Sequence, residues 1–295
     1  MTQSTVAAPA IGVFDSGFGG LTVLRALLAH LPRARFAFLG DTARLPYGSK
    51  SRRTIARYAV ESAQFLVGEE GAEFLVIACN TASALALDAI QTAVPAIPVL
   101  GVIEPGADAA QAASQSGDVL VIATDATVQS HAYAAACRAR GLRALEKACP
   151  LLVPLVEEGW TSHPVTEQVI RIYIDELLAD ARGASLNPDT LVLGCTHYPL
   201  LRTLIEAAVP PGMRVIDSAE AAAQAASRLI DGRAAAAPQP IFAASSAERI
   251  GLLPNPAPET CLRFFATDSV DKFQRLGSAF LGRPVPRVHL VDLGG

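Results

Sequence analysis

The sequence predicts an α/β fold made of two similar α/β domains with mostly parallel sheets. Short, nearly continuous apolar runs alternate along the chain with stretches whose apolar residues have helical spacing, a pattern typical of parallel sheets covered on both faces. The segment FLVIACNTAS (74–83) is echoed by TLVLGCTHYP (190–199), which indicates two related halves. At roughly 150 residues per domain, the 295 residues allow two domains.

The first strand, turn and helix are expected near the N-terminus. A strand is predicted over 11–14, a turn over 15–20 and a helix over 21–31. The helix carries five leucines at helical spacing, which places them on one buried face. A second strand is predicted over 35–39.

The same alternation continues downstream. Ser49 or Ser51 can cap the helix that follows the second strand. The stretch 232–260 contains five prolines and is expected to be an irregular excursion before a final strand and helix. The remaining buried strands are expected over 74–78, 99–103, 119–123, 191–193, 214–216 and 262–265.

The composition argues against several classes of protein. Hydrophobic residues make up 51% of the chain and charged residues 18%, which excludes intrinsic disorder. The net charge is −4 without a basic cluster, so a nucleic-acid binder is not expected. The longest apolar run, 74–79, is far shorter than the roughly 20 residues of a membrane span, and the first ten residues lack the features of a secretory signal. We therefore expect a cytoplasmic protein without nucleic-acid or membrane partners.

Two of the five cysteines stand out by position. No C-x-x-C pair is present, which argues against a disulfide framework or a four-cysteine zinc site. Cys79 and Cys195 each follow a strand at or near the start of a helix, where unpaired N–H groups and the helix dipole lower a thiol pKa from about 8.5. Cys137, Cys149 and Cys261 lack this setting and are expected to be packing residues.

Other polar residues follow the same strands. Asp15 opens a glycine-rich turn and favours an ammonium ligand or a proton-transfer role, although it also suits a tight turn with a capping acid. The loop 41–49 can offer the Tyr47 hydroxyl and backbone amides to a distal carboxylate. The acid–base candidates are His197 and the adjacent acids Glu157 and Glu158.

Six segments then show a family resemblance, because they occur in the order and spacing found in glutamate racemases: IGVFDSGFGG, FLGDTARLPYGS, VIACNTAS, VPLVEEG, LGCTHYPLL and VIDSAE. The chain resembles this family from Ile11 onward. The resemblance implies a cofactor-independent enzyme of two α/β domains that interconverts L- and D-glutamate for bacterial peptidoglycan. It implies no cofactor and no metal, glutamate as the small-molecule partner, and it allows a homodimer.

The resemblance also implies catalytic roles. The residue matching Cys79 deprotonates D-glutamate, and the residue matching Cys195 deprotonates L-glutamate. Asp15 and His197 are expected to assist proton movement beside Cys79 and Cys195 respectively, and Glu157 to assist the second base. Two thiols on opposite faces of one carbon agree with the echoed cysteine segments.

The expected substrate contacts follow from the chemistry of glutamate, which has two carboxylates and one ammonium. Donors near helix starts suit the α-carboxylate, Asp15 and Ser16 suit the ammonium, and the 46–48 segment suits the γ-carboxylate. The chain departs from the family pattern in the segment ATDATVQS, which contains Thr124, because many family members have glycine nearer the turn there. The full substrate-binding set is Asp15, Ser16, Pro46, Tyr47, Gly48, Asn80, Thr81, Thr124, Thr196 and His197.

Three other functions share part of this sequence pattern. An aspartate racemase of the same family would share the chemistry and differ in the pocket for the side-chain carboxylate; the segment DTARLPYGS favours glutamate. A Cys–His hydrolase would need only one cysteine. A non-enzymatic amino-acid-binding protein gives no reason for thiols at two matching strand ends.

The domain layout is expected to place the two cysteines in different domains. The chain should cross near Glu104 and return near Asp217. The first domain would then hold 11–104 with 218–295, and the second 105–217.

Overall fold

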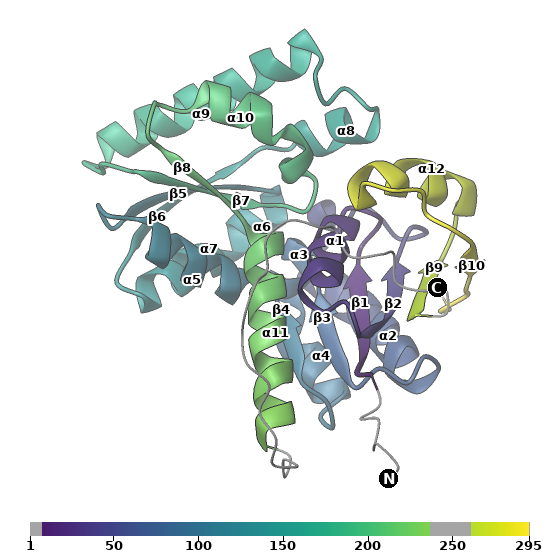
Figure 1. The fold of residues 1–295 in the computed structure, drawn as a ribbon. Coiled ribbons are helices and arrows are strands. Elements are labelled where there is room, and N and C mark those ends of the chain that lie inside the picture. Colours follow the sequence, from purple (N-terminus) through teal and green to yellow (C-terminus); the bar gives the residue numbers. More distant parts are fainter. Residues whose placement is uncertain (1–7, 237–260, 295) are drawn as a thin grey trace, which may run out of the picture.

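The computed structural model describes residues 8–236 and 261–294, whose strands form two parallel sheets (Figure 1). The first sheet has the strand order β10-β9-β2-β1-β3-β4 and the second β6-β5-β7-β8. All pairs of neighbouring strands are parallel. The strands are β1 (Ala10–Asp15), β2 (Arg35–Gly40), β3 (Phe74–Ile77), β4 (Val99–Gly101), β5 (Asp118–Ala123), β6 (Arg143–Ala148), β7 (Thr190–Gly194), β8 (Arg214–Asp217), β9 (Leu262–Ala266) and β10 (Val288–Leu290).

Helices cover both faces of these sheets. They are α1 (Leu21–His30), α2 (Arg52–Gly68), α3 (Asn80–Leu85), α4 (Leu87–Ala93), α5 (Ile103–Ala113), α6 (Asp125–Ser130), α7 (Ala132–Ala139), α8 (Leu152–Glu157), α9 (Pro164–Gly183), α10 (Arg202–Ala208), α11 (Ser218–Ala236) and α12 (Val270–Leu281), with short 3-10 helices η1 (Tyr47–Ser49) and η2 (Tyr198–Leu201). In the second sheet, α9 and α10 lie on one face and α5 and α7 on the other (Figure 1). The long helix α11 packs against α1 and α5 and so joins the two halves.

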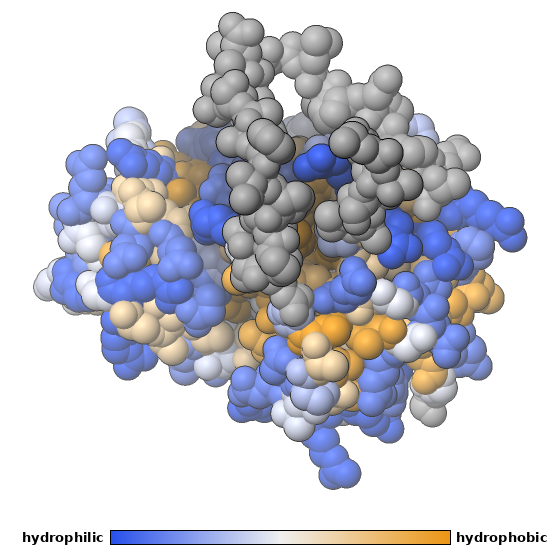
Figure 2. Space-filling model, turned by 60° about the horizontal axis from the view of Figure 1, so that its bottom comes forward, coloured by the Kyte–Doolittle hydropathy of each residue, from blue (hydrophilic) through white to orange (hydrophobic). Residues whose placement is uncertain are grey.

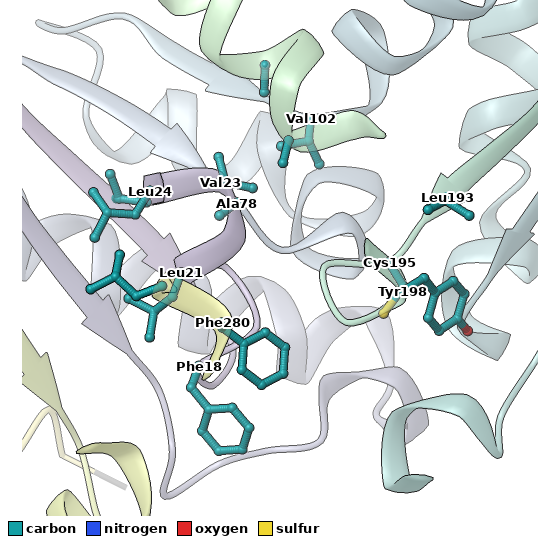
Figure 3. Close-up of a cluster of buried hydrophobic side chains, with 14 of the residues drawn as sticks. Phe18, Leu21, Val23, Leu24, Ala78, Val102, Leu193, Cys195, Tyr198 and Phe280 are labelled. Atoms are coloured by element: carbon teal, nitrogen blue, oxygen red, sulfur yellow. The ribbon is translucent and has the colours of Figure 1, made fainter. Parts of the chain in front are cut away.

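One hydrophobic core runs from the first sheet into the second. Phe18 and Phe280 on the first side belong to the same buried cluster as Leu193, Cys195 and Tyr198 on the second (Figure 3). The loop after β1 therefore packs against the loop after β7.

The parallel register aligns the carboxyl ends of the strands within each sheet. Asp15 pairs with Gly40 at the end of β1 and β2, and Ala123 pairs with Gly194 at the end of β5 and β7. Because the carboxyl ends of parallel strands meet at one edge of a sheet, the loops that follow them form the edge at which α/β proteins bind ligands.

The predicted α/β class with two mostly parallel sheets is confirmed. Two strands were not predicted, β6 and β10, and both lie at sheet edges. The residues of β6, RALEKA, are only partly buried, and an edge strand needs no continuous apolar run. The domain boundaries at 104/105 and 217/218 remain a prediction.

Some element boundaries also differ from those expected. Ser51 and not Ser49 caps α2, since its hydroxyl accepts from the Thr54 N–H at 3.4 Å. The predicted strand over 99–103 ends at Gly101, and Ile103 begins α5. The predicted excursion at 232–260 was wrong at its start, because α11 continues to Ala236; residues 237–260 lie outside the described part of the chain.

The face seen in Figure 2 is mainly hydrophilic at its periphery, with a smaller area of hydrophobic residues near its centre. Within residues 8–236 and 261–294, no helix is both long and apolar enough to cross a membrane.

Candidate active site

A cavity of about 460 Å³ lies where the strand ends of the two sheets face each other. Both predicted thiols, Cys79 and Cys195, line it. The other lining residues belong to the segments 16–18, 45–49, 80–81, 124–125, 150–158 and 196–197. Residues that follow strands of different sheets therefore share one enclosure.

Cys79 is the N-cap of α3 and is buried. Its Sγ accepts from the Ala82 N–H at 3.4 Å and forms a hydrogen bond with Ser16 Oγ at 3.3 Å. Burial nevertheless raises the pKa of the Cys79 thiol to about 12, with a further rise from the Asp15 charge, and the two hydrogen bonds only partly offset this. The expected lowering of the Cys79 pKa by the helix start was wrong, because desolvation of the thiolate is the larger effect.

Cys195 occupies the equivalent place after β7. It is buried, and its Sγ lies 3.9 Å from Nδ1 of His197. In Figure 3 its side chain and that of Tyr198 leave the loop in different directions. The thiol and the imidazole thus form a close pair at the cavity wall.

His197 is held by residues from both halves of the molecule. Its Nε2 lies 3.5 Å from Glu157 Oε1, and the other Glu157 oxygen lies 3.5 Å from the Lys272 ammonium of α12. The Phe280 ring packs edge-on against the imidazole at 5.0 Å. Burial lowers the pKa of His197, but Cys195 and Glu157 outweigh it and raise that pKa to about 10. The imidazole is therefore cationic at neutral pH.

The structure distinguishes between the two adjacent acids. Glu157 pairs with His197, whereas Glu158 is exposed although it also reaches the cavity rim. Burial raises the pKa of Glu157, yet the His197 and Lys272 cations hold it below the usual value.

Asp15 lies behind the cavity wall. Its side chain is buried, and Oδ2 accepts from the Gly17 N–H at 2.9 Å, while Oδ1 has no hydrogen-bond partner among the described residues. Burial raises the Asp15 pKa, partly offset by His197 and by backbone donors. Asp15 is not among the residues that line the cavity, and its charge raises the pKa of both Cys79 and His197.

The loop expected to receive the distal carboxylate has a buried anchor. The Tyr47 hydroxyl donates to Asp41 Oδ2 at 2.5 Å, and Arg44 donates to both oxygens of the same carboxylate. The Tyr47 hydroxyl therefore stabilises the loop in this arrangement, because it already donates its hydrogen to Asp41. Pro46 and Gly48 line the cavity beside it.

Small polar side chains form the part of the cavity wall next to that loop, where a Cβ at Gly48 would lie 3.4 Å from Thr124. The hydroxyls of Thr81 and Thr124 lie 3.0 Å apart, and both contact Thr127. The Asn80 amide accepts from the Tyr133 hydroxyl at 2.7 Å, while its Nδ2 is buried with no hydrogen-bond partner among the described residues. This wall offers donors to an anion.

Thr196 completes the set of predicted residues at the cavity, and its hydroxyl lies 3.3 Å from His197 Nδ1. Sequence reasoning missed Lys272 and Tyr133, whose chemistry depends on contacts with partners 115 and 53 residues away in the chain. No local motif marks either residue.

Comparison with known proteins agrees with this geometry. Residues 11–226 match the family described as Asp/Glu/Hydantoin racemase. The chain belongs to this family. It is therefore an isomerase of the racemase type, and the resemblance to glutamate racemases is confirmed.

The similarity to individual members covers nearly the whole chain. A glutamate racemase of Koribacter versatilis is 54% identical over 291 residues, which cover 97% of this chain and 98% of that relative. The glutamate racemase from Francisella tularensis, solved in complex with D-glutamate, is 33% identical with a TM-score of 0.80, covering 97% of this chain and 98% of that one. The glutamate racemase from Thermus thermophilus, solved with β-chloro-D-alanine, is 42% identical with a TM-score of 0.77 at the same coverage.

Proposed function

We propose that this racemase interconverts L- and D-glutamate by a two-thiol mechanism. The observation that carries the proposal is the presence of Cys79 and Cys195, from strand ends of different sheets, in one cavity. Relatives named glutamate racemase, at up to 54% identity among those compared, support the choice of glutamate.

In the proposed reaction one thiolate removes the α-proton and the opposite thiol returns a proton to the other face. With D-glutamate, Cys79 accepts the proton and becomes a thiol, while Cys195 gives its proton to the α-carbon and becomes a thiolate. With L-glutamate the roles reverse. Each turnover breaks one C–H bond and forms another. At its end, each cysteine has the protonation state that the other cysteine had at the start.

The neighbouring titratable groups would control which thiol is ionised. We assign His197 and Glu157 to Cys195, since a cationic imidazole 3.9 Å from a sulfur stabilises a thiolate. We assign Asp15 to Cys79, whose high pKa in the free protein requires a partner that accepts or supplies its proton. Ser16, hydrogen-bonded to Cys79, lines the cavity beside this sulfur.

We assign the α-carboxylate of glutamate to donors at the ends of β3, β5 and β7. The unpartnered Asn80 Nδ2 is the most direct candidate, supported by the hydroxyls of Thr81, Thr124 and Thr196. Fixed donors here would also stabilise the carbanion-like charge that develops as the α-proton leaves.

The other two charged groups of the substrate have separate partners in this proposal. The ammonium faces Ser16, with the Asp15 charge behind it. The γ-carboxylate meets the Pro46–Gly48 segment through the backbone, because the Tyr47 hydroxyl is held by Asp41.

The biological setting follows from the proposed product. D-Glutamate is a building block of bacterial peptidoglycan, so we propose a cytoplasmic role in its supply. We further propose that the enzyme needs no cofactor or metal and that the two sheets mark domains 11–104 with 218–295 and 105–217. The homodimer remains a prediction.

The proposal is tested by incubating each glutamate enantiomer in deuterated water. The expected result is loss of optical rotation together with incorporation of deuterium at the α-carbon. A folded protein that produces neither would overturn the proposal. Faster exchange of aspartate than of glutamate would instead assign the enzyme to the shorter substrate.

A further inference from the structure

A buried tyrosine forms a hydrogen bond that links the two halves of the molecule beside the cavity. Tyr133 lies on α7, which packs on the second sheet, and its side chain is fully buried. Its hydroxyl donates to Oδ1 of Asn80, on α3 of the first half, at 2.7 Å. This hydrogen bond joins residues 53 positions apart in the chain.

The surrounding backbone leaves room for this ring. A Cβ at Gly106 would lie 3.2 Å from the Tyr133 hydroxyl, and a Cβ at Gly194 would lie 3.0 Å from its Cε2. Both contacts are tighter than ordinary van der Waals distances, so glycine at each position allows α5 and β7 to approach the ring closely. The hydroxyl is thereby fixed where Asn80 can reach it.

A side-chain amide has two ends with opposite hydrogen-bonding character. Its oxygen accepts and its nitrogen donates, so a donor placed at one end decides which atom faces the other way. Burial raises the pKa of Tyr133 far above its ordinary value, which keeps its hydroxyl protonated and available as a donor. With Oδ1 directed to Tyr133, the amide nitrogen is directed elsewhere.

The Asn80 nitrogen has no protein partner. Nδ2 is buried and makes no hydrogen bond within the described residues, and Asn80 lines the cavity. A buried donor without an acceptor is unfavourable, which argues that a ligand oxygen completes the arrangement.

We propose that Tyr133 is a positioning residue that orients the Asn80 amide, so that Nδ2 donates to the α-carboxylate of the substrate. The inference rests on the proposed function, which supplies that carboxylate. Tyr133 acts on the substrate through Asn80 and does not contact it, since Tyr133 is not among the residues lining the cavity. Its hydroxyl also interacts with the Ser218 side chain, which is buried and does not line the cavity.

The first test is a double-mutant cycle. Tyr133→Phe removes one oxygen and keeps the ring, and we expect kcat/KM for both glutamate enantiomers to fall about tenfold, mainly through KM. Asn80→Ala should lower kcat/KM further. Adding Tyr133→Phe to Asn80→Ala should then cost little, because the group that it orients is gone. Additive losses in the double variant would overturn the proposal.

Tyr198→Phe is the matched control. Tyr198 is equally buried, and its hydroxyl donates to the Cys149 carbonyl at 3.1 Å; neither residue is among those that line the cavity. Tyr198→Phe removes this hydroxyl and should lower the midpoint of thermal unfolding about as much as Tyr133→Phe does. The KM of Tyr198→Phe should stay near the wild-type value. An equal rise of KM in both variants would reduce the Tyr133 effect to a general loss of packing and refute the orienting role.

A second comparison does not depend on whether Tyr133→Phe folds. Asn80→Asp places a carboxylate oxygen where the proposal requires a donor to the substrate carboxylate, so its KM should exceed that of Asn80→Ala. Tighter glutamate binding by Asn80→Asp would mean that the cavity side of residue 80 faces the ammonium, which contradicts the proposal. The wild type is assayed first: an inactive wild type counts against the glutamate racemase assignment, whereas these variants decide the role of Tyr133.

Discussion

The environment of Cys79 combines two opposing effects on one sulfur atom. The start of α3 and the Ser16 hydroxyl stabilise a thiolate, whereas burial and the neighbouring Asp15 destabilise it. The pKa of about 12 means that burial prevails in the free protein. Cys195 differs because a cationic imidazole lies beside it. The two cysteines therefore lie in electrostatically different surroundings, Cys79 beside Asp15 and Cys195 beside the His197 cation.

At this scale we predict that Cys79→Ser and Cys195→Ser each lower glutamate racemisation by about 10²–10⁴-fold, because every turnover needs both a base and an acid. Each variant keeps one thiol and can still take the α-proton from one enantiomer. With the two enantiomers of β-chloroalanine, whose chloride can leave after deprotonation, the variants should show opposite preferences in chloride release.

Cys261→Ser provides the control for these variants. Cys261 is partly exposed and lies outside the cavity lining, so its activity should equal that of the wild type. A variant at position 79 or 195 that racemises glutamate at close to the wild-type rate would overturn the two-thiol mechanism.

His197 predicts a pH dependence of stability. Its folded pKa of about 10 lies above the unfolded value of 6.5, so the folded state holds a proton that the unfolded state releases. The stabilisation is complete below pH 6.5 and is lost as the pH rises toward about 10, at no more than about 1.4 kcal/mol per pH unit for one proton.

Denaturant unfolding between pH 6.5 and about 7.5 measures this effect, below the pH at which ordinary thiols, with a pKa near 8.5, ionise appreciably. The free energy of unfolding should fall with pH in the wild type and fall less steeply in His197→Asn. Equal slopes in the two proteins would show that His197 is not cationic in the folded state.

At the scale of elements, the loop between β1 and α1 is packed directly on the loop after β7. A Cβ at Gly19 would lie 2.3 Å from Thr196 Oγ1 and 2.6 Å from the His197 ring. Phe18 lies in the same loop, and its ring centroid is 5.7 Å from that of Phe280 on α12. Lys272, also on α12, forms an ion pair with Glu157. Elements from both ends of the chain therefore hold the Cys195–His197 pair in place.

We predict that Gly19→Ala costs about 1–3 kcal/mol of stability and about 10²-fold or more in kcat/KM, because the added methyl displaces the loop that carries His197. Gly68→Ala is the matched control, since nothing lies within 4 Å of a Cβ there and the residue is helical. It should be neutral or stabilising by about 0.4–1 kcal/mol. Denaturant unfolding and steady-state kinetics check both variants, and a fully active Gly19→Ala protein would disprove the close packing.

At the scale of the whole molecule, the proposed reaction depends on two halves that meet at their strand ends. The cavity takes its thiols and the polar wall of Asn80, Thr81 and Thr124 from segments that follow strands of both sheets. Within the described residues, no group of three or more His, Cys, Asp or Glu side chains is arranged to hold a metal ion.

We predict that the wild type keeps its full racemase activity after exhaustive dialysis against a chelator. The proposed chemistry uses only protein thiols and fixed donors, so no small molecule has to be restored. Activity is measured before and after dialysis, with pyridoxal phosphate or a divalent metal added back to separate samples. A loss of activity that either addition restores would rule out the cofactor-independent mechanism.

The sequence by itself determined the α/β class, the strand ends that line the cavity and the pair of cysteines found there. These features are local: hydrophobic periodicity sets the elements, and parallel strands bring their carboxyl ends to one edge. Cys79, Cys195, Thr81 and Thr196 could therefore be assigned to a common site before any contact was known. The edge strand β6 was not predicted, because a partly buried strand does not need the continuous run of apolar residues that marks a buried one.

Only the tertiary structure decided how those residues are tuned. The choice of Glu157 over Glu158, the commitment of Tyr47 to Asp41, and the contact between Tyr133 and Asn80 depend on which groups meet in the fold. The Cys79 pKa depends on burial, which sums over every atom that excludes water from the sulfur. Sequence patterns specify where a side chain lies along an element, whereas its charge state and partners are set by distant segments packed around it.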